Sequence, residues 1–235
     1  MHSCEIRKNV GVLNDRIFAL SRNLEINQAK IIEKNACKRK LINFLTLKNT
    51  PLLNKYNFSY KKNKLTLIKG NNELIKVELN NSSLLIEKLM NLETSLKGPI
   101  FFLINKEIPF FDTTNSNSIS NTISLINLKS IEDFEKKINQ KIEFERFRAN
   151  FYVEGIDAWE EYNWVGRQIK INNVSFKVIK NIPRCSATNL QPHNDISDIN
   201  LPSLLKKEYG NIDMGVYLRP LKDGIVNVGE KISLI

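Results

Sequence analysis

The sequence predicts a mainly β, α+β protein, and three observations indicate this. The chain has 235 residues, 42% of them hydrophobic, which is enough to bury one large β-rich domain or two small ones. Apolar and polar residues alternate over 167–171 and 174–180, on either side of a two-asparagine turn, as in a half-buried hairpin. Only short stretches have the period of a helix. We therefore expect sheets with a few short helices.

Further elements are indicated by turn and capping residues along the chain. A glycine-asparagine turn separates two alternating segments in the first half, and serine, asparagine and glycine mark helix ends elsewhere. The elements expected from these signals are strands at 58–67 and 73–79, a helix over 83–92, a helix beginning at a Ser130–Asp133 capping box, and a helix over 201–209 between Asn200 and Gly210.

The net charge of +10 comes from 35 basic and 25 acidic residues that are spread along the chain. Charge scattered in this way is typical of a solvated surface rather than of a nucleic-acid interface. No apolar run approaches the ~20 residues that a membrane helix needs, and the N-terminus lacks the apolar core of a signal peptide. We therefore expect a cytoplasmic protein that binds neither nucleic acid nor membrane.

Three cysteines and two histidines limit the metal and redox chemistry of the chain. Cys4, Cys37 and Cys185 are odd in number and widely spaced, which is not the pattern of a disulfide framework. They form no C-x-x-C pair, and with His2 and His193 they make no zinc constellation. If a metal is bound, a cofactor must therefore bring most of its ligands.

The segment 182–197 is the strongest candidate for a functional site, because a cysteine follows an arginine there, just after an apolar strand. A thiolate is a nucleophile and a soft metal ligand, and the neighbouring guanidinium of Arg184 favours the charged form of the Cys185 thiol. Pro183 ends the strand pairing, so Cys185 would lie at the strand's open end. The alternative is an inert, partly buried cysteine, and the residues alone leave both interpretations open.

Several blocks in the second half of the chain resemble the MOSC family, the domain named for the C-terminal part of molybdenum-cofactor sulfurases. In the first half, the G-x-x-x-D-R-x-x-x-L block from Gly11 to Leu20 resembles the smaller β-domain that precedes many MOSC domains. The blocks that carry the MOSC resemblance are Arg146 to Gly155, Trp159-x-Glu161-x-x-Trp164, Arg184-Cys185-x-x-Thr188-Asn189, Asp198, Leu201-Pro202-x-x-Leu205, Gly210 to Tyr217 and Gly224 to Glu230.

The resemblance implies a fold and a domain organisation. The expected fold is a MOSC β-barrel with a few short helices, preceded by a smaller β-rich domain. We place the MOSC N-terminal-like β-domain at residues 1–95 and the MOSC domain at 96–235. Relatives begin with a further strand that faces the cofactor, so we expect the N-terminal domain of this chain to be truncated at its start.

The resemblance also implies a cofactor, Mo-molybdopterin, in which pterin dithiolene sulfurs and one protein thiolate hold the metal. Soft thiolates suit such a centre. Cys185 would be the metal ligand and the catalytic residue, and Arg184 would bind the cofactor and stabilise the thiolate. The other residues expected to bind or orient the cofactor are Arg16, Arg148, Asn150, Thr188, Asn189 and Asp213.

The arginine-rich block around residue 148 has two possible roles. In extended chain Arg146, Arg148 and Asn150 would point to one face, and a guanidinium fork beside an amide suits a phosphate and the edge of a pterin. Alternatively, Arg148 pairs with Asp157 or Glu160 and fixes a loop.

Two further cofactor candidates have structural alternatives. Arg16, which the resemblance places near the cofactor's phosphate, would otherwise form a surface pair with Asp15. Asp213 would hold a pterin nitrogen or cap a turn. The residues alone do not decide between these roles.

The resemblance implies a molybdenum-dependent oxidoreductase. We expect a reductase of N-hydroxylated small molecules, similar to the amidoxime-reducing proteins and the hydroxylaminopurine reductases. The chain has no four-cysteine spacing for an iron–sulfur cluster and no flavin motif, so an external electron-donor protein is the expected partner. The alternative is a carrier that passes the cofactor, or sulfur held as a Cys185 persulfide, to a cofactor-biosynthesis enzyme. A structural role without cofactor is the third hypothesis.

Overall fold

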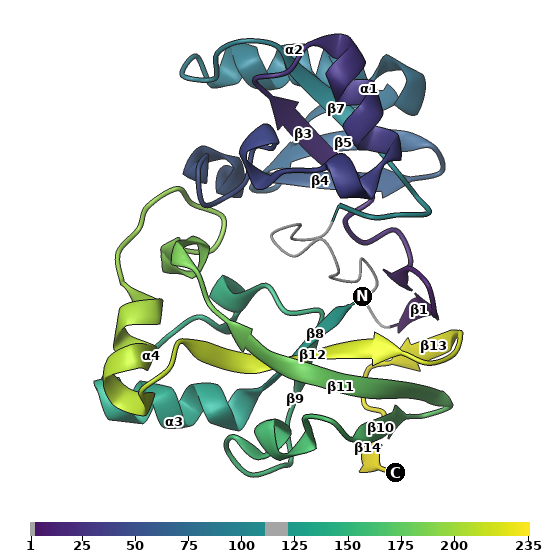
Figure 1. The fold of residues 1–235 in the computed structure, drawn as a ribbon. Coiled ribbons are helices and arrows are strands. Elements are labelled where there is room, and N and C mark those ends of the chain that lie inside the picture. The colour runs from purple at the N-terminus through teal and green to yellow at the C-terminus, as the bar shows by residue number, and fades with distance from the viewer. Residues whose placement is uncertain (1–2, 111–121) are drawn as a thin grey trace. The chain divides into compact units, whose positions relative to one another are not determined.

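The computed structural model describes residues 3–110 and 122–235 (Figure 1). The chain divides into two compact units, of which unit 1 comprises Met1–Asp15, Ile119–Pro192 and Ser197–Ile235, and unit 2 comprises Arg16–Ser118 and His193–Ile196. These ranges differ from the predicted domains at 1–95 and 96–235, because the first strand of the chain pairs with a strand near its end. The compact units describe packing, so the domain boundary expected between residues 95 and 96 stays a prediction.

Unit 1 is built on a six-stranded sheet with the strand order β14-β10-β11-β12-β8-β9. Its neighbouring strands are antiparallel except β8 and β9, which are parallel. A second sheet has the order β13-β1-β2. The strands of these sheets are β1 (Ser3–Arg7), β2 (Gly11–Val12), β8 (Ile123–Asn127), β9 (Phe151–Val153), β10 (Gln168–Ile171), β11 (Val174–Pro183), β12 (Asp213–Pro220), β13 (Gly224–Asn227) and β14 (Ile232–Leu234).

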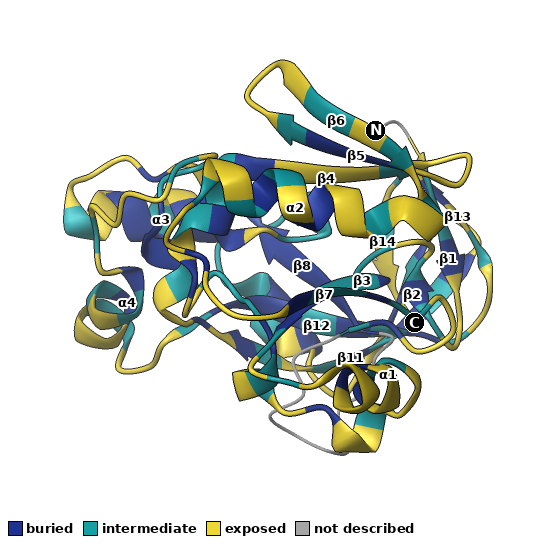
Figure 2. Cartoon of the chain, turned by 90° about the horizontal axis from the view of Figure 1, so that it is seen from above, coloured by how far each residue is buried: buried dark blue, intermediate teal, exposed yellow. Residues whose placement is uncertain are grey.

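The hairpin predicted around the two-asparagine turn is confirmed by β10 and β11. Val174, Phe176 and Val178 of β11 are buried, whereas the residues between them are only half-buried. Asn172 begins the turn with a φ of 49°, a left-handed conformation that asparagine tolerates. Every residue of β8 is buried, as the dark blue strand in Figure 2 shows. The main core of unit 1 therefore lies along β8, β11 and β12.

Two helices of unit 1 form a second core through residues that include Phe134 and Leu205. They are α3 (Leu128–Ile138) and α4 (Leu201–Tyr209). The prediction for α4 is confirmed at both ends. The Asn200 side chain accepts a hydrogen bond from the Ser203 backbone at 3.2 Å, and Gly210 ends the helix with a φ of 75°.

The predicted start of α3 at Ser130 is wrong, because the helix begins two residues earlier at Leu128. The Asn127 side chain caps it by accepting a hydrogen bond from the Lys129 backbone at 3.1 Å. Ser130 is buried instead, and its hydroxyl lies 2.9 and 3.0 Å from the two carboxylate oxygens of Glu161. The local pattern could not show that an acidic residue distant in the sequence would take this hydroxyl.

Unit 2 contains a two-stranded ladder of β3 and β7 and a three-stranded sheet of β4, β5 and β6. The helix predicted over 83–92 is confirmed by α2 (Ser82–Leu92), which buries Leu85 and Leu89 in the core of this unit. The other elements are β3 (Phe18–Arg22), α1 (Ile26–Lys34), β4 (Tyr56–Lys61), β5 (Lys64–Lys69), β6 (Asn72–Glu78) and β7 (Ile100–Ile104).

The single strand predicted over 58–67 is wrong, because β4 and β5 form a hairpin there. Lys62 and Asn63 turn the chain with φ values of 48° and 63°. Positive φ at both central residues matches the two-residue turns that suit hairpins, in which Asn-Gly is the usual pair. A Lys-Asn pair is a weaker indication of a turn than Asn-Gly. Because apolar and polar residues alternate on both sides of it, the two strands were predicted as one.

Short 3-10 helices connect the main elements, and the fold as a whole is mainly β with helices, as predicted. Closure of the larger sheet into a barrel stays a prediction, since β9 and β14 are its two edges. Among the described residues, no helix has the length and apolar character to cross a membrane. The 3-10 helices are η1 (Ala36–Lys38), η2 (Leu41–Asn43), η3 (Pro51–Lys55), η4 (Leu79–Asn81), η5 (Phe144–Phe147), η6 (Glu160–Trp164) and η7 (Ser186–Asn189).

Candidate functional site

Cys185 lies between the end of β11 and the short helix η7. Pro183, the last residue of β11, pairs with Asp213 at the start of β12, so the sheet holds the chain up to two residues before the cysteine. The Cys185 carbonyl accepts hydrogen bonds from the Thr188 backbone at 3.0 Å and from Thr188 Oγ1 at 2.8 Å. The Cys185 side chain is exposed. The backbone of the cysteine is therefore fixed while its thiol is open to solvent.

Arg148 is close enough to Cys185 for their charges to interact. It ends η5 with a φ of 49°, a conformation that costs a non-glycine residue about 1 kcal/mol. Tyr152 holds the chain on both sides of it, since its hydroxyl donates to the Phe144 carbonyl at 2.9 Å and accepts from the Ala149 backbone at 3.0 Å. Part of the Arg148 side chain is exposed, but nearby protein atoms remove some of the water around its guanidinium and so lower its pKa. The charge of Cys185 acts in the opposite direction and raises it.

Arg184 is buried, and the backbone of the protein binds its guanidinium. Nε and Nη2 donate to the Met214 carbonyl, Nε at 2.9 Å, and Nη1 donates to the Phe147 carbonyl at 3.2 Å. Burial lowers the pKa of Arg184 to about 10, and Cys185 is among the groups whose charge acts in the opposite direction. Arg184 thus joins η5 to β12 and places a buried positive charge beside the thiol.

Thr188 and Asn189 are buried in η7, where their polar atoms serve the loop itself. Thr188 Oγ1 donates to the Cys185 carbonyl, as described above. Asn189 Oδ1 accepts from the backbone of Leu201, the first residue of α4, at 3.0 Å. These bonds shape the chain after the cysteine, and the predicted contact of both residues with a cofactor stays a prediction.

Asn150 does not share a strand face with Arg148, so that prediction is wrong. Arg148 ends a 3-10 helix, and β9 begins only after Asn150. The Asn150 Oδ1 atom accepts from the Ser124 backbone at 3.0 Å and from Ser124 Oγ at 2.9 Å, and its Nδ2 atom donates to Asp15 Oδ2 at 3.0 Å. The amide therefore fastens the segment before β9 to β8, an interaction between residues too far apart for local patterns to show.

The remaining two candidates lie in different units. Arg16 belongs to unit 2, has a φ of 55°, and accepts a hydrogen bond from the Phe110 backbone at 2.7 Å through its carbonyl. Asp213 begins β12 in unit 1, and its backbone donates to Asn211 Oδ1 at 2.9 Å. Asn211 therefore caps this turn. The cofactor roles of Arg16 and Asp213 stay predictions.

Arg146 has a role that sequence reasoning missed. It is buried, and Nη1 and Nη2 donate to the two carboxylate oxygens of Asp198 at 2.7 and 2.9 Å. Nη1 also donates to the Asn189 carbonyl at 3.0 Å, and Nε donates to Glu143 at 2.6 Å. Arg146 thus closes the loop after Cys185 by holding both of its ends. The Arg146-Phe147-Arg148 spacing had drawn attention to this residue, but we expected an extended strand there, whereas Arg146 lies in the 3-10 helix η5.

The arginine that stays available at the site is Arg148. Among the described residues it forms no ion pair with Asp157 or Glu160, and Asp157 lies 3.9 Å from Lys129 instead. The loop-fixing role suggested for Arg148 therefore belongs to Arg146.

The donors around Cys185 restrict which metal group could bind there. Within the described ranges, no cluster of three or more histidine, cysteine or acidic side chains could hold a metal ion. The site offers one soft thiol, the exposed charge of Arg148 and the buried charge of Arg184. This set fits an anionic group that brings the other metal ligands with it and takes a single thiolate from the chain.

Fold and site together define a β-rich protein that presents an exposed thiol just after the end of a central strand, with the charges of Arg148 and Arg184 close enough to interact with it. The model of the MOSC domain family matches residues 112–233, a little over half of the chain. The chain therefore belongs to the MOSC domain family.

The chain is similar to proteins named mitochondrial amidoxime reducing component 2. The protein of Rattus norvegicus is 27% identical over 165 residues, which are 62% of this chain and 46% of that protein. The protein of Macaca fascicularis is 28% identical over 161 residues, which are 63% of this chain and 47% of that protein. The chain thus spans about half the length of these relatives.

Among solved structures, the chain is similar to YiiM from Geobacillus stearothermophilus at 18% identity, with a TM-score of 0.38 over 48% of this chain and 53% of that one. It is also similar to the YuaD protein from Bacillus subtilis at 11% identity, with a TM-score of 0.42 over 99% of this chain and 84% of that one.

Proposed function

We propose that this protein is a molybdenum-dependent reductase of N-hydroxylated compounds that holds Mo-molybdopterin through the Cys185 thiolate. The observation that supports the proposal best is an exposed thiol that interacts with the charge of Arg148, in a chain whose relatives are named amidoxime reducing components. An amidoxime is an N-hydroxylated amidine. The proposal therefore takes from the relatives only the type of bond that is reduced, the N–O bond.

Each residue of the site has a role in this proposal. When bound, the cofactor would supply the two-electron redox chemistry that reduction of an N–O bond needs. Cys185 contributes the thiolate, and Arg148 stabilises the negative charge there. Arg184 adds a buried positive charge, and Thr188 orients the cysteine by holding its carbonyl.

A partner follows from the stoichiometry of the reaction. Reduction of an N-hydroxyl group consumes two electrons and two protons and releases the N–H compound and water. The three cysteines of this chain do not have the spacing of an iron–sulfur site. We therefore propose an external electron-donor protein. A cytoplasmic location, with neither nucleic acid nor membrane as partner, stays a prediction.

The decisive experiment is the metal and pterin content of protein purified from a host that makes the cofactor. We expect stoichiometric molybdenum and pterin in the wild type, and loss of both in Cys185→Ala, because in this proposal the Cys185 thiolate is the metal ligand that the chain contributes. Cys37→Ala is the matched control, since Cys37 is also exposed but lies in unit 2. Molybdenum retained in Cys185→Ala would refute the thiolate ligand. Loaded protein is then assayed with an aromatic amidoxime and a chemical electron donor.

The exposed thiol also suits a second function, a carrier of sulfur or of the cofactor. Mass spectrometry of the Cys185 peptide distinguishes the two. An added sulfur atom on Cys185 in protein without molybdenum would favour a persulfide carrier. Loaded protein that transfers its cofactor to an apoenzyme but reduces no amidoxime would favour a cofactor carrier.

A further inference from the structure

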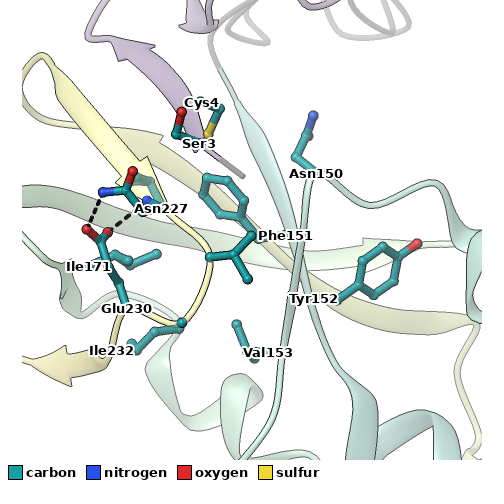
Figure 3. A pocket seen from close by; sticks show the side chains of 13 residues that line it. Ser3, Cys4, Asn150, Phe151, Tyr152, Val153, Ile171, Asn227, Glu230 and Ile232 are labelled. Atoms are coloured by element: carbon teal, nitrogen blue, oxygen red, sulfur yellow. Dashed lines mark hydrogen bonds between the residues drawn. The ribbon is translucent and has the colours of Figure 1, made fainter. Parts of the chain in front are cut away.

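Unit 1 contains a second site, a cavity of about 360 Å³ that Cys185 does not line. Its walls come from the edge strands β9 and β14 of the larger sheet and from β1 and β13 of the smaller one (Figure 3). Neither Arg148 nor Arg184 is among the lining residues, but Asn150 and Tyr152, which hold the segments on either side of Arg148, are. The cavity therefore lies near the thiol site without including its charged groups, and its volume lies at the lower end of the range for small-molecule pockets.

Most of the cavity wall is apolar. Phe151 and Val153 of β9 line it together with Ile171 of β10, Val226 of β13 and Ile232 of β14. Figure 3 shows the Phe151 ring between Cys4 and Val153, with Ile171 and Ile232 on the other side of the space. An aromatic ring beside branched aliphatic side chains favours a flat or compact hydrocarbon body.

A single carboxylate, that of Glu230, interrupts the apolar wall. Neutral donors hold it. The Asn227 backbone donates to Oε2 at 3.0 Å, and the Asn227 side-chain amide donates to Oε1 at 2.7 Å (Figure 3). The Asn172 side-chain amide also donates to Oε1, at 2.8 Å. The bonds from Asn227, first from its backbone and then from its side chain, lower the pKa of Glu230, so the group is ionised at neutral pH. A carboxylate has about four acceptor positions, so Oε2 can accept one more hydrogen bond.

Glu230 has no cationic partner among the described residues, although the chain carries a net charge of +10. Cys4, which also lines the cavity, does not balance this charge. Burial and then the charge of Glu230 raise the pKa of the Cys4 thiol, which keeps it neutral. The cavity therefore combines an apolar surface, a neutral thiol and one negative charge held in place by amides.

We propose that this cavity binds a small molecule that has a flat apolar body and one cationic nitrogen, of the class of arylalkylamines. The body would contact the wall formed by Phe151, Val153 and Ile171, and the ammonium group would donate to Glu230 Oε2. The negative charge repels an anion of the same shape, and a neutral analogue makes a weaker bond because its donor is uncharged. The proposal does not rest on the proposed reductase activity.

The test uses benzylamine as the probe and benzyl alcohol as its neutral analogue, with binding measured by calorimetry on the full chain. We expect benzylamine to bind at least about tenfold more tightly, the difference that a charged hydrogen bond makes over a neutral one. Benzylamine should also slow N-ethylmaleimide labelling of Cys4, measured by mass spectrometry, and leave labelling of Cys37 unchanged. Cys37 is the internal control because it is exposed in the other unit.

Two variants separate the contribution of charge from that of shape. Glu230→Gln should weaken the binding of benzylamine by about tenfold and the binding of benzyl alcohol by much less. Val153→Trp should abolish the binding of both compounds, because the larger side chain would fill the cavity. If that variant does not fold, Glu230→Gln decides alone. Equal binding of amine and alcohol, or no effect of Glu230→Gln, would overturn the proposal. So would a dimer that Val153→Trp dissociates, because the cavity would then be a contact with a second copy.

Discussion

Two arginines two residues apart, Arg146 and Arg148, have opposite environments, and the difference defines the site. Arg146 is buried and bound to the carboxylates of Asp198 and Glu143. Arg148 is exposed and forms no ion pair with the described residues. The charge that affects its pKa most is that of Cys185. A guanidinium that is already paired positions the loop, whereas an unpaired one is available to a ligand.

The first residue-scale prediction concerns the charge that Arg148 places beside Cys185. Arg148→Gln should slow alkylation of Cys185 by iodoacetamide several-fold near neutral pH, because it removes a positive charge that interacts with the cysteine and attracts its thiolate form. Arg167→Gln is the control, since Arg167 is an exposed arginine of the same unit. Equal alkylation rates in the two variants would show that Arg148 does not act on the thiol.

The second residue-scale prediction is a pH dependence that comes from the Arg146–Asp198 pair. Hydrogen bonding to Arg146 is the main cause that lowers the pKa of Asp198 to about 2. The unfolded value is about 3.9, so the pair stabilises the fold fully above about pH 4, and this stability is lost as the pH falls towards about 2. After allowance for screening at this partly exposed side chain, the contribution is about 1 kcal/mol.

Urea unfolding of Asp198→Asn and wild type measures this contribution. The variant should be less stable near neutral pH, and the difference should shrink below about pH 3, where the wild-type carboxyl is protonated as well. Asp157→Asn should change little at any pH, because the Asp157 side chain is 97% exposed. A difference that stays constant with pH would mean that the charge of Asp198 does not contribute.

At the scale of elements, the close packing of β12 against β8 depends on one glycine. A Cβ atom on Gly215 would lie 2.4 Å from the Leu125 carbonyl oxygen and 2.6 Å from Ile126 Cγ1. Gly215 also has a φ of 77°, which side chains adopt at a cost. The residue therefore allows β12, which follows the loop after the thiol, to lie against the most buried strand of the sheet.

Gly215→Ala should lower the free energy of unfolding by about 3 kcal/mol or prevent folding, because the clash adds to the backbone strain. Gly166→Ala is the matched control, with a φ of 83° and nothing within 4 Å of its Cβ position. It should cost about 1 kcal/mol, the backbone term alone. Thermal and urea unfolding of both variants make the comparison, and equal losses would refute the clash.

The elements that sequence analysis predicted correctly are those with local signals. The hairpin of β10 and β11 has alternation and a turn, and α4 has a cap at one end and a glycine at the other. The failures have tertiary causes. Ser130 was predicted to cap a helix, and the local sequence could not show that its partner is Glu161, which lies 31 residues away. Lys62 and Asn63 form a tight turn without the glycine that usually signals one.

The site followed the same rule. The position of Cys185 after a strand could be predicted because a strand pattern and a proline precede it. The roles of Arg146 and Asn150 could not be predicted, since their partners Asp198 and Ser124 are 52 and 26 residues away. The Glu230 cavity had no sequence signal, because it is formed by strands from both ends of the chain.

At the scale of the whole molecule, the chain passes from one compact unit to the other at four places, after Asp15, Ser118, Pro192 and Ile196. Strand β1 contributes Ile6 to the main core of unit 1, and the short segment His193–Ile196 belongs to unit 2, where Asn54 Nδ2 donates to the Asn194 carbonyl at 2.6 Å and Lys55 lies 3.3 Å from Asp195.

The interleaved chain means that no single cut separates this protein into its two halves. A piece beginning at residue 119 would lack β1 and β2, so β13 would lose its antiparallel partner. A piece from 16 to 118 would lack the Asp195 carboxylate that pairs with Lys55. Genetic dissection, fragment complementation and domain transplantation would therefore each have to join segments that are discontinuous in the gene.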